Sequence, residues 1–389
     1  MTIRETTTPL LRLLHHTAGD APALHHITAL PRRPLEAEQD LGALYEELAA
    51  ELARQDLQLL QEKLFALASV SEAAAAARAE ALARRGATAD HLPATHVGCT
   101  PCQGGLVAGV QICAADSGAA CRTLRVDGQA VGRQLDAGGA RVAFVPDITG
   151  CDDQGHLPKD RTVQCENMFR RVTALVQALG FTFQDVARTW IYVDRLLQWY
   201  DELNRVRTAA YSELGVYDPQ NFAALPASTG IQGAHPSGAE CFMDLLLVSG
   251  DPATPPARPM RSTHQCEAGA YGSSFSRGKR VEVGGARLLY VSGTASIDLS
   301  GATVHLGDHR QQVLETMDAV QNLLSAEQTD LAQIVTSVLF FKKEQGFAAW
   351  QELCRQGRLP SFPGIPVYAD VCRDDLLFEV EPLVVLDGP

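Results

Sequence analysis

The carboxyl-terminal part of the chain holds the stretch that decides the fold, and residues 367–381 read VYADVCRDDLLFEVE. The pattern predicts two strands joined by a polar turn, because apolar and polar residues alternate along the second arm. Glu379 stands there between Phe378 and Val380, with Cys372 just across the turn. Two interpretations stay open. On an edge strand the glutamates would be solvated, whereas in a pocket wall burial would raise the pKa of Glu379 and make it a general acid.

The composition limits the kinds of partner that the protein could bind. The chain has 389 residues, a net charge of -13 and 46% hydrophobic residues, enough for sizeable cores. No basic run is present, which argues against nucleic acid or an anionic membrane as partner. No apolar run is long enough to span a bilayer, and residues 1–16 lack the order of a signal peptide. We therefore expect a cytoplasmic protein whose 10 cysteines are mostly reduced.

Cys99 and Cys102 form a C-x-x-C pattern, for which zinc binding and redox chemistry are the functional interpretations. Zinc needs a second pair of ligands, and Cys113 and Cys121 are not spaced as one. A redox pair should open a helix, but glycines follow here instead. A turn with two ordinary thiols is the better interpretation, and we expect neither a metal nor an organic cofactor.

The same order of predicted elements occurs three times along the chain: helix, strand, helix, strand, strand. In the first unit, leucines at 41, 44, 48 and 52 mark one face of a helix, and an alanine-rich helix follows from Ser71. A period this long indicates repeated domains, each an α+β layer with two helices on one face of a mixed sheet. The predicted division is a degenerate N-terminal unit at 1–116, a middle unit at 117–250, a linker and site loop at 251–273, and a C-terminal unit at 274–389.

The element order and several phrases resemble the Rid (reactive-intermediate deaminase) superfamily, in which small sheets backed by two helices assemble as trimers with sites between subunits. The third unit carries LLYVSGTASID at 288–298 and DDLLFEVEPLVV at 374–385, and the second carries DVARTWIYVDRL at 185–196. This resemblance implies an intramolecular pseudo-trimer. Rid deaminases hold the substrate carboxylate with an arginine at the start of the penultimate strand. No arginine stands there in residues 93–95, at 225–228 or near Gly364, so we do not expect an imine deaminase.

A closer resemblance is to the chorismatases, a branch of this fold that removes pyruvate from chorismate. Their Ala-Arg-Thr-Trp phrase matches residues 187–190 and implies that Arg188 binds a carboxylate. Their Tyr-Gly phrase leading to Phe-x-Arg matches Tyr271, Phe275 and Arg277, and their catalytic glutamate matches Glu379. A cysteine before the acidic turn, here Cys372, goes with hydroxybenzoate products.

Two departures from the chorismatases concern the parts that contact substrate. The Pro-Arg-Pro-Pro part of the tyrosine loop is missing. The phrase Tyr-Arg-x-Phe-Cys-x-Gly-Arg is also absent from the second helix of the middle unit, where Asn204, Arg205, Val206, Arg207 and then Tyr211 stand instead. The resemblance thus implies a kept catalytic frame and a changed substrate-reading part.

The predicted site residues each have a plainer alternative. Glu379 and Cys372 are the predicted catalytic pair, although Cys372 could equally be a buried apolar thiol. As an alternative to carboxylate binding, Arg188 could pair with Asp185 or Asp194. Tyr271 could anchor a loop instead of contacting substrate, and His264 could be a base or an ordinary histidine. The predicted substrate-binding residues are Arg188, Arg277, Tyr271, Phe275 and Arg205.

We therefore hypothesise a cofactor-independent enzyme of aromatic natural-product biosynthesis that binds an anionic small molecule between the second and third units. Glu379 would move protons during elimination, cyclisation and aromatisation, as in the formation of carbazole quinones from indole-derived keto acids. One alternative is a chorismatase that makes 3-hydroxybenzoate and pyruvate, and another is a non-catalytic Rid-type binding protein. We expect a pseudo-trimeric monomer or a dimer of it, with no nucleic-acid or membrane partner.

Overall fold

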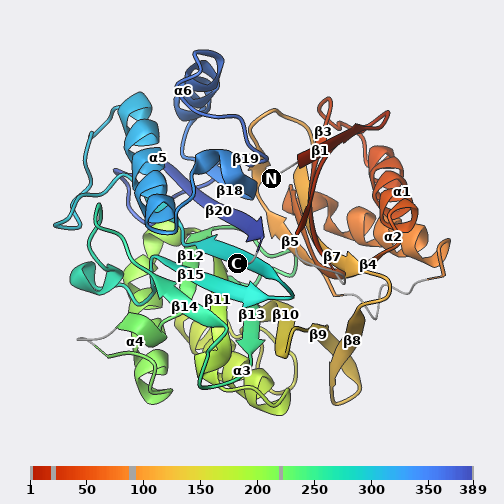
Figure 1. The fold of residues 1–389 in the computed structure, drawn as a ribbon, viewed down its shortest axis with the longest axis horizontal. Helices are drawn as coiled ribbons and strands as arrows, with labels where there is room; N and C mark the ends of the chain where they lie inside the picture. The colour runs from red at the N-terminus through yellow and green to blue at the C-terminus, as the bar shows by residue number, and fades with distance from the viewer. Residues whose placement is uncertain (1–2, 19–22, 87–92, 219–221, 388–389) are drawn as a thin grey trace.

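The computed structural model describes residues 3–18, 23–86, 93–218 and 222–387. It contains three mixed sheets, each backed by two α-helices on one face. The helix pairs lie at the periphery and the sheets face one another in the middle (Figure 1). A core of apolar side chains from all three sheets fills this middle, and each helix pair closes a further core against its own sheet.

The first sheet has the strand order β1-β2-β3-β7-β4-β5. The leucine face of α1 packs into the core beneath the sheet, as its helical period predicts. β4 runs parallel to β5 and antiparallel to β7. The first unit is therefore a full sheet with two helices rather than a helical hairpin. Its elements are β1 Ile3–Thr7, β2 Leu11–Ala18, β3 Leu24–Pro31, α1 Gln39–Arg54, β4 Leu57–Ala66, α2 Ser71–Ala83, β5 Thr95–Gly98 and β7 Val107–Asp116.

The second sheet has the order β12-β11-β13-β10-β9-β8. The side chain of Asp160 caps the start of α3 by accepting from the backbone N–H groups of Thr162 and Val163. The hairpin of β8 and β9 extends the sheet on the side away from β12. The elements are β8 Ala120–Val126, β9 Gln129–Ala137, β10 Ala140–Thr149, α3 Arg161–Ala178, β11 Val186–Val193, α4 Tyr200–Glu213, β12 Ala227–Gln232 and β13 Cys241–Ser249.

The third sheet has the order β14-β15-β16-β20-β18-β19-β6, and β17 also pairs with β20. The hairpin of β15 and β16 turns at Gly284 and Gly285, both at positive φ, as a tight hairpin turn requires. β14 lies within the stretch predicted as linker. The elements are β14 Ala257–Met260, β15 Gly278–Val283, β16 Ala286–Val291, β17 Thr294–Ala295, α5 His309–Ala326, β18 Ile334–Phe341, α6 Glu344–Arg355, β19 Ile365–Tyr368 and β20 Phe378–Asp387.

The three units join around the ends of their penultimate strands, β5, β12 and β19. Gly98 bridges to Ala234 of the second unit, and the backbone N–H of Gln232 donates to the Asp370 carbonyl of the third. The third unit returns to the first through β19, which pairs with β6 (Thr100–Pro101). The contacts thus close a ring of three. The predicted α+β fold with three tandem units in one chain is confirmed.

The two strands predicted in residues 367–381 are present, but they are not neighbours. β18 lies between β19 and β20, parallel to the former and antiparallel to the latter. Among the described residues, we find no helix long and apolar enough to cross a membrane.

Candidate active site

Glu379 lies on an interior strand. β20 is flanked by β16 and then β17 on one side and by β18 on the other, so it has no free edge. The side chains of Glu379 and Glu381 share its inner face and are only 4% and 6% exposed. The interpretation of this segment as a solvated edge strand is therefore wrong.

The position of Glu379 carries a carboxyl in one unit of three. In the third unit, Glu379 pairs with Phe340 of the strand next to it. In the second unit the residue equivalent to Glu379 is Phe242, which pairs with Tyr192, and in the first unit it is Gly109, which pairs with Phe65. A proton-transfer site built on this position can therefore form once per chain, beside the third sheet.

A small cavity between the second and third units brings together Glu379 and four other predicted residues. Its space is about 30 Å³, enough for about two water molecules, so a larger ligand needs some of the lining side chains to move. The predicted residues that line it are Glu379, Cys372, Tyr271, Phe275 and Arg277, joined by Tyr200, Ser228, Gly230, Gly293 and Arg373.

Burial makes the Glu379 carboxyl a weak acid. Loss of solvation is the largest influence and raises its pKa, and the nearby charge of Glu381 adds to this effect. Arg188 and Arg277 act in the opposite direction, and the resulting pKa is about 8. Glu379 can therefore hold a proton near neutral pH and give it to a bound substrate.

The Cys372 thiol faces the same cavity and is held in its protonated form. Burial raises its pKa to about 12, and the neighbouring Glu379 contributes in the same direction. A thiol with such a pKa is a poor nucleophile, because the reactive species is the thiolate. Burial also raises the pKa of the adjacent Tyr200 hydroxyl to about 12. The cavity thus presents protonated groups as potential donors.

Arginines and aromatic rings alternate from one wall of this cavity into the protein behind it, where Arg207 packs on Phe275 without lining the cavity. The guanidinium carbons of Arg207 and Arg277 lie 5.7 and 5.5 Å from the ring centre of Phe275. Those of Arg277 and Arg373 lie 5.4 and 5.0 Å from the ring centre of Tyr271. We call these five residues the arginine ladder: Arg207, Phe275, Arg277, Tyr271 and Arg373.

The guanidinium groups of the ladder are hydrogen-bonded to neutral partners. Arg277 donates to the carbonyl of Cys266, Arg373 to the carbonyl of Gly301, and Arg207 to Ser273 and Asn204. In the described ranges, no carboxylate forms an ion pair with any of the three. Arg207 and Arg277 are only 1% and 2% exposed. Buried cations without counter-ions are costly, so this wall favours an anionic ligand.

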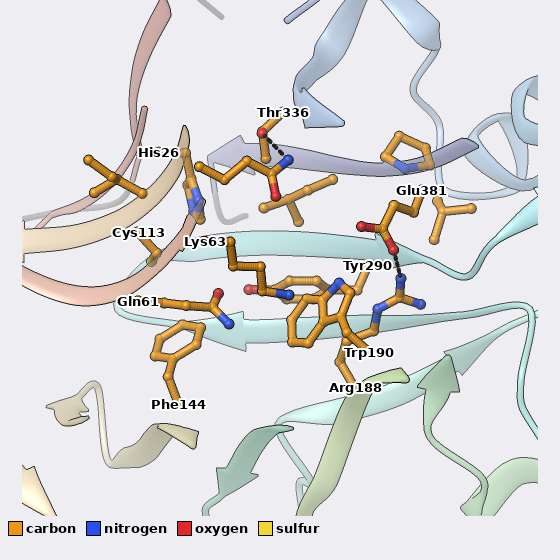
Figure 2. A pocket seen from close by; sticks show the side chains of 15 residues that line it. His26, Gln61, Lys63, Cys113, Phe144, Arg188, Trp190, Tyr290, Thr336 and Glu381 are labelled. Atoms are coloured by element: carbon orange, nitrogen blue, oxygen red, sulfur yellow. Dashed lines mark hydrogen bonds and ion pairs between the residues drawn. The ribbon is translucent and has the colours of Figure 1, made fainter. Parts of the chain in front are cut away.

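The structure places Arg188 outside this cavity. It lines a second, central cavity of about 50 Å³ to which all three units contribute (Figure 2). Its Nη2 donates to Glu381 Oε2 at 3.1 Å, so its carboxylate partner is neither Asp185 nor Asp194. Lys63 from the first unit pairs with Asp244 in the same region, 3.3 Å apart. Two cations and two carboxylates therefore balance one another here.

Arg205 also lies away from the cavity that Glu379 lines. It is exposed in a groove between α3 and α4, whereas Arg207, two residues further along α4, points to Phe275. His264 is bonded to Glu315 and does not line the cavity. Sequence reasoning missed Tyr200, Arg207, Arg373 and Gly293. Helical periodicity could have identified Arg207, because it lies on the same buried face of α4 as Leu203, Val206 and Tyr211.

No group of three or more histidine, cysteine or acidic side chains in the described ranges could hold a metal ion. Cys99 and Cys102 lie near β6, and burial raises the pKa of both thiols. They have the character of ordinary thiols.

The pH dependence of stability should reveal the raised pKa of Glu379. In the unfolded chain a glutamate titrates near ~4.3, so between there and about pH 8 the folded state binds the extra proton. Stability contributed at this position therefore falls as pH rises through that window and is level above it. We expect Glu379→Gln to raise the melting temperature relative to wild type at pH 8.5 but hardly at pH 5. Equal differences at both pH values, measured by scanning calorimetry, would contradict the raised pKa.

Comparison with known proteins agrees with this geometry. No family model matches the chain. The 3-hydroxybenzoate synthase of Streptomyces hygroscopicus is 24% identical over 227 residues, which cover 53% of this chain and 65% of that protein, less than two thirds of its length. A chorismatase crystal structure superposes with a TM-score of 0.58 and 20% identity, over 84% of this chain and 92% of that one. The chain has a chorismatase-like fold.

The chorismatase-like fold accounts for the arrangement of three sheets in one chain. A Yersinia pestis protein of the Rid family, of unknown function, aligns with 33% of this chain and 99% of its own, at 16% identity and a TM-score of 0.29.

Proposed function

We propose that the protein is a cofactor-independent lyase that acts on an anionic, ring-bearing small molecule in the cavity between the second and third units. One observation carries this proposal: a buried carboxyl with a pKa of about 8 faces Arg277 and Arg373, which form no ion pair with a carboxylate in the described ranges. The arginines would hold the anionic groups of the substrate, and Glu379 would deliver a proton to its reacting carbon.

Chorismate is the first substrate to consider. It is a dianion with a ring and an enol ether, and protonation of the enol ether at its methylene carbon starts the loss of pyruvate. Conversion to one hydroxybenzoate and one pyruvate conserves all atoms and needs no oxidant or reductant. The likeness to the Streptomyces hygroscopicus 3-hydroxybenzoate synthase supports this candidate, as does Cys372 in the cavity wall.

A second candidate is a ring-forming condensation of an indole-derived keto acid, which closes a carbazole ring by loss of water from a substrate already at the oxidation level of the quinone product. The specific observation in its favour is the changed wall on α4, where Arg207 and Tyr200 approach the cavity and the chorismatase phrase is absent. The same acid and the same anion-binding wall would serve both reactions.

Incubation with chorismate tests the first candidate. We expect release of pyruvate, followed by oxidation of NADH with lactate dehydrogenase, together with an equal amount of hydroxybenzoate by liquid chromatography. The Glu379→Gln variant at the same concentration is the matched control. If wild type releases no more pyruvate than that control, chorismate is not the substrate. If chorismate, indole-derived keto acids and related dianions all bind without being converted, the protein is a binding protein and the proposal of a lyase fails.

A further inference from the structure

The two cavities adjoin along the inner face of β20. Glu379 and Glu381 are two residues apart on one strand, so their side chains point to the same side. Glu379 reaches the active-site cavity and Glu381 reaches the central cavity. A contact made by Glu381 can therefore influence the wall against which Glu379 rests.

Arg188 connects Glu381 to β12. Its Nη2 donates both to Glu381 Oε2, at 3.1 Å, and to the hydroxyl of Thr229, at 2.5 Å. The ion pair of Arg188 and Glu381 is visible at the edge of the central cavity (Figure 2). Both Arg188 and Thr229 are 1% exposed, so these bonds are shielded from competing water.

Thr229 in turn holds the backbone beside the catalytic carboxyl. Its hydroxyl oxygen accepts from the N–H of Gly293 at 3.1 Å. Gly293 lies between β16 and β17 and touches Glu379 directly, since a Cβ built on it would lie 2.3 Å from Glu379 Oε1. Only glycine allows so close an approach of backbone and carboxyl.

We propose that Thr229 is a positioning residue for Glu379. Its hydroxyl bonds to the Gly293 backbone and so holds that backbone against the Glu379 carboxyl, while the Arg188–Glu381 ion pair holds the hydroxyl itself in place. The proposal rests on the proposed function of Glu379 as the acid. Without the hydrogen bond from the Gly293 N–H to the Thr229 hydroxyl, the backbone at Gly293 can move away from Glu379. The carboxyl then gains room to turn toward the cationic groups around it.

Several charged and titratable groups, Arg188 among them, face this carboxyl, and a change in its titration must be judged against all of them. They come from the same strand, from β11, from α4, from the site loop and from the turn before β20. They are Glu381, Arg188, Tyr200, Tyr271, Arg277, Cys372 and Arg373.

Thr229→Val removes the hydroxyl at nearly constant shape and tests the proposal. We expect kcat to fall about two- to tenfold, the loss typical of one buried hydrogen bond, with KM nearly unchanged. We also expect the protonation midpoint of Glu379 to move to lower pH. That midpoint can be read by infrared difference spectroscopy as the carboxyl band that Glu379→Gln lacks. Thr229→Ser keeps the hydroxyl and should restore both values.

The matched control is Thr28→Val. Thr28 is fully buried, and its hydroxyl joins the first and third units by donating to Thr336, away from Glu379. It should lower thermal stability about as much as Thr229→Val while leaving kcat and the infrared midpoint at their wild-type values. If the two variants behave alike in both readouts, Thr229 has a structural role and the proposal is overturned.

The infrared midpoint does not depend on catalysis, so the two proposals fail in different ways. If Glu379→Gln keeps wild-type turnover, the proposed function is wrong, whereas the midpoint still reports whether Thr229 positions the carboxyl. If Thr229→Val leaves that midpoint unchanged, the positioning proposal is wrong whatever Glu379 does.

Discussion

Replacement of Glu379 by glutamine should lower kcat at pH 7 by about 10²–10⁴-fold, the usual contribution of a general acid or base. Glutamine keeps the size and shape of the side chain, and the buried site already favours a neutral group over a carboxylate. The fold should therefore be preserved while the transferable proton is lost. The measurement is steady-state turnover on the substrate that wild type converts, with circular dichroism to check the fold.

Asp375→Asn is the matched control for this change. It is the same replacement of carboxylate by amide, on an exposed residue of the turn that precedes β20, where the side chain accepts from Thr303. It should leave kcat within about twofold of wild type, because surface changes away from special features cost little. A Glu379→Gln enzyme that turns over as fast as Asp375→Asn would exclude Glu379 as the acid.

The dependence of activity on pH should also reveal Glu379 as the acid. Because Glu379 acts as its protonated form, activity should be level below pH 8 and fall above it, as the group with a pKa of about 8 loses its proton. The pattern of β20 could suggest a general acid but not this value. The value depends on Glu381, Arg188 and Arg277, which come from three separate segments.

The structure brings most of the predicted site residues together in one cavity but places Arg188 and Arg205 elsewhere. Glu379, Cys372 and the Tyr271–Arg277 loop are marked by a resemblance, and they meet in one cavity. Arg188 is also identified by a resemblance, but it lies in the central cavity, because its position on the β-strand points the side chain at Glu381. A strand position fixes the face of a side chain, but the partner across an interface follows from how the units pack.

The two arginines of α4 show that the prediction of site residues depends on knowing which face of a helix is buried. Arg205 and Arg207 are two residues apart, which places them on different sides of a helix. Without the packing of α4 against α3, either could be assigned to the site, and the exposed one was predicted. Likewise, residues 367–381 predict two strands but not that β18 separates them, because pairing between distant segments leaves no local pattern.

Replacement of Arg277 by glutamine should weaken substrate binding far more than it slows the chemical step. Arg277 is the middle cation of the arginine ladder and touches both Phe275 and Tyr271. Loss of a charge-assisted contact to a substrate carboxylate costs ~1.5–3 kcal/mol, so KM should rise about 10–150-fold with a smaller change in kcat. Arg277→Lys should recover only part of this, because an ammonium group lacks the planar fork of a guanidinium.

Arg280→Gln is the control for the loss of a positive charge. Arg280 is on β15, three residues from Arg277, but its guanidinium pairs with Glu282 and Glu327 outside the cavity. Its replacement should leave KM unchanged. Calorimetric titration with the substrate, or with a dicarboxylate analogue, should show the affinity of Arg277→Gln falling and becoming less sensitive to salt than that of wild type. If both arginine variants bind the anion as tightly as wild type, the ladder stabilises the loop rather than the ligand, since the buried cations would then be satisfied by the carbonyl of Cys266 and the flanking rings alone.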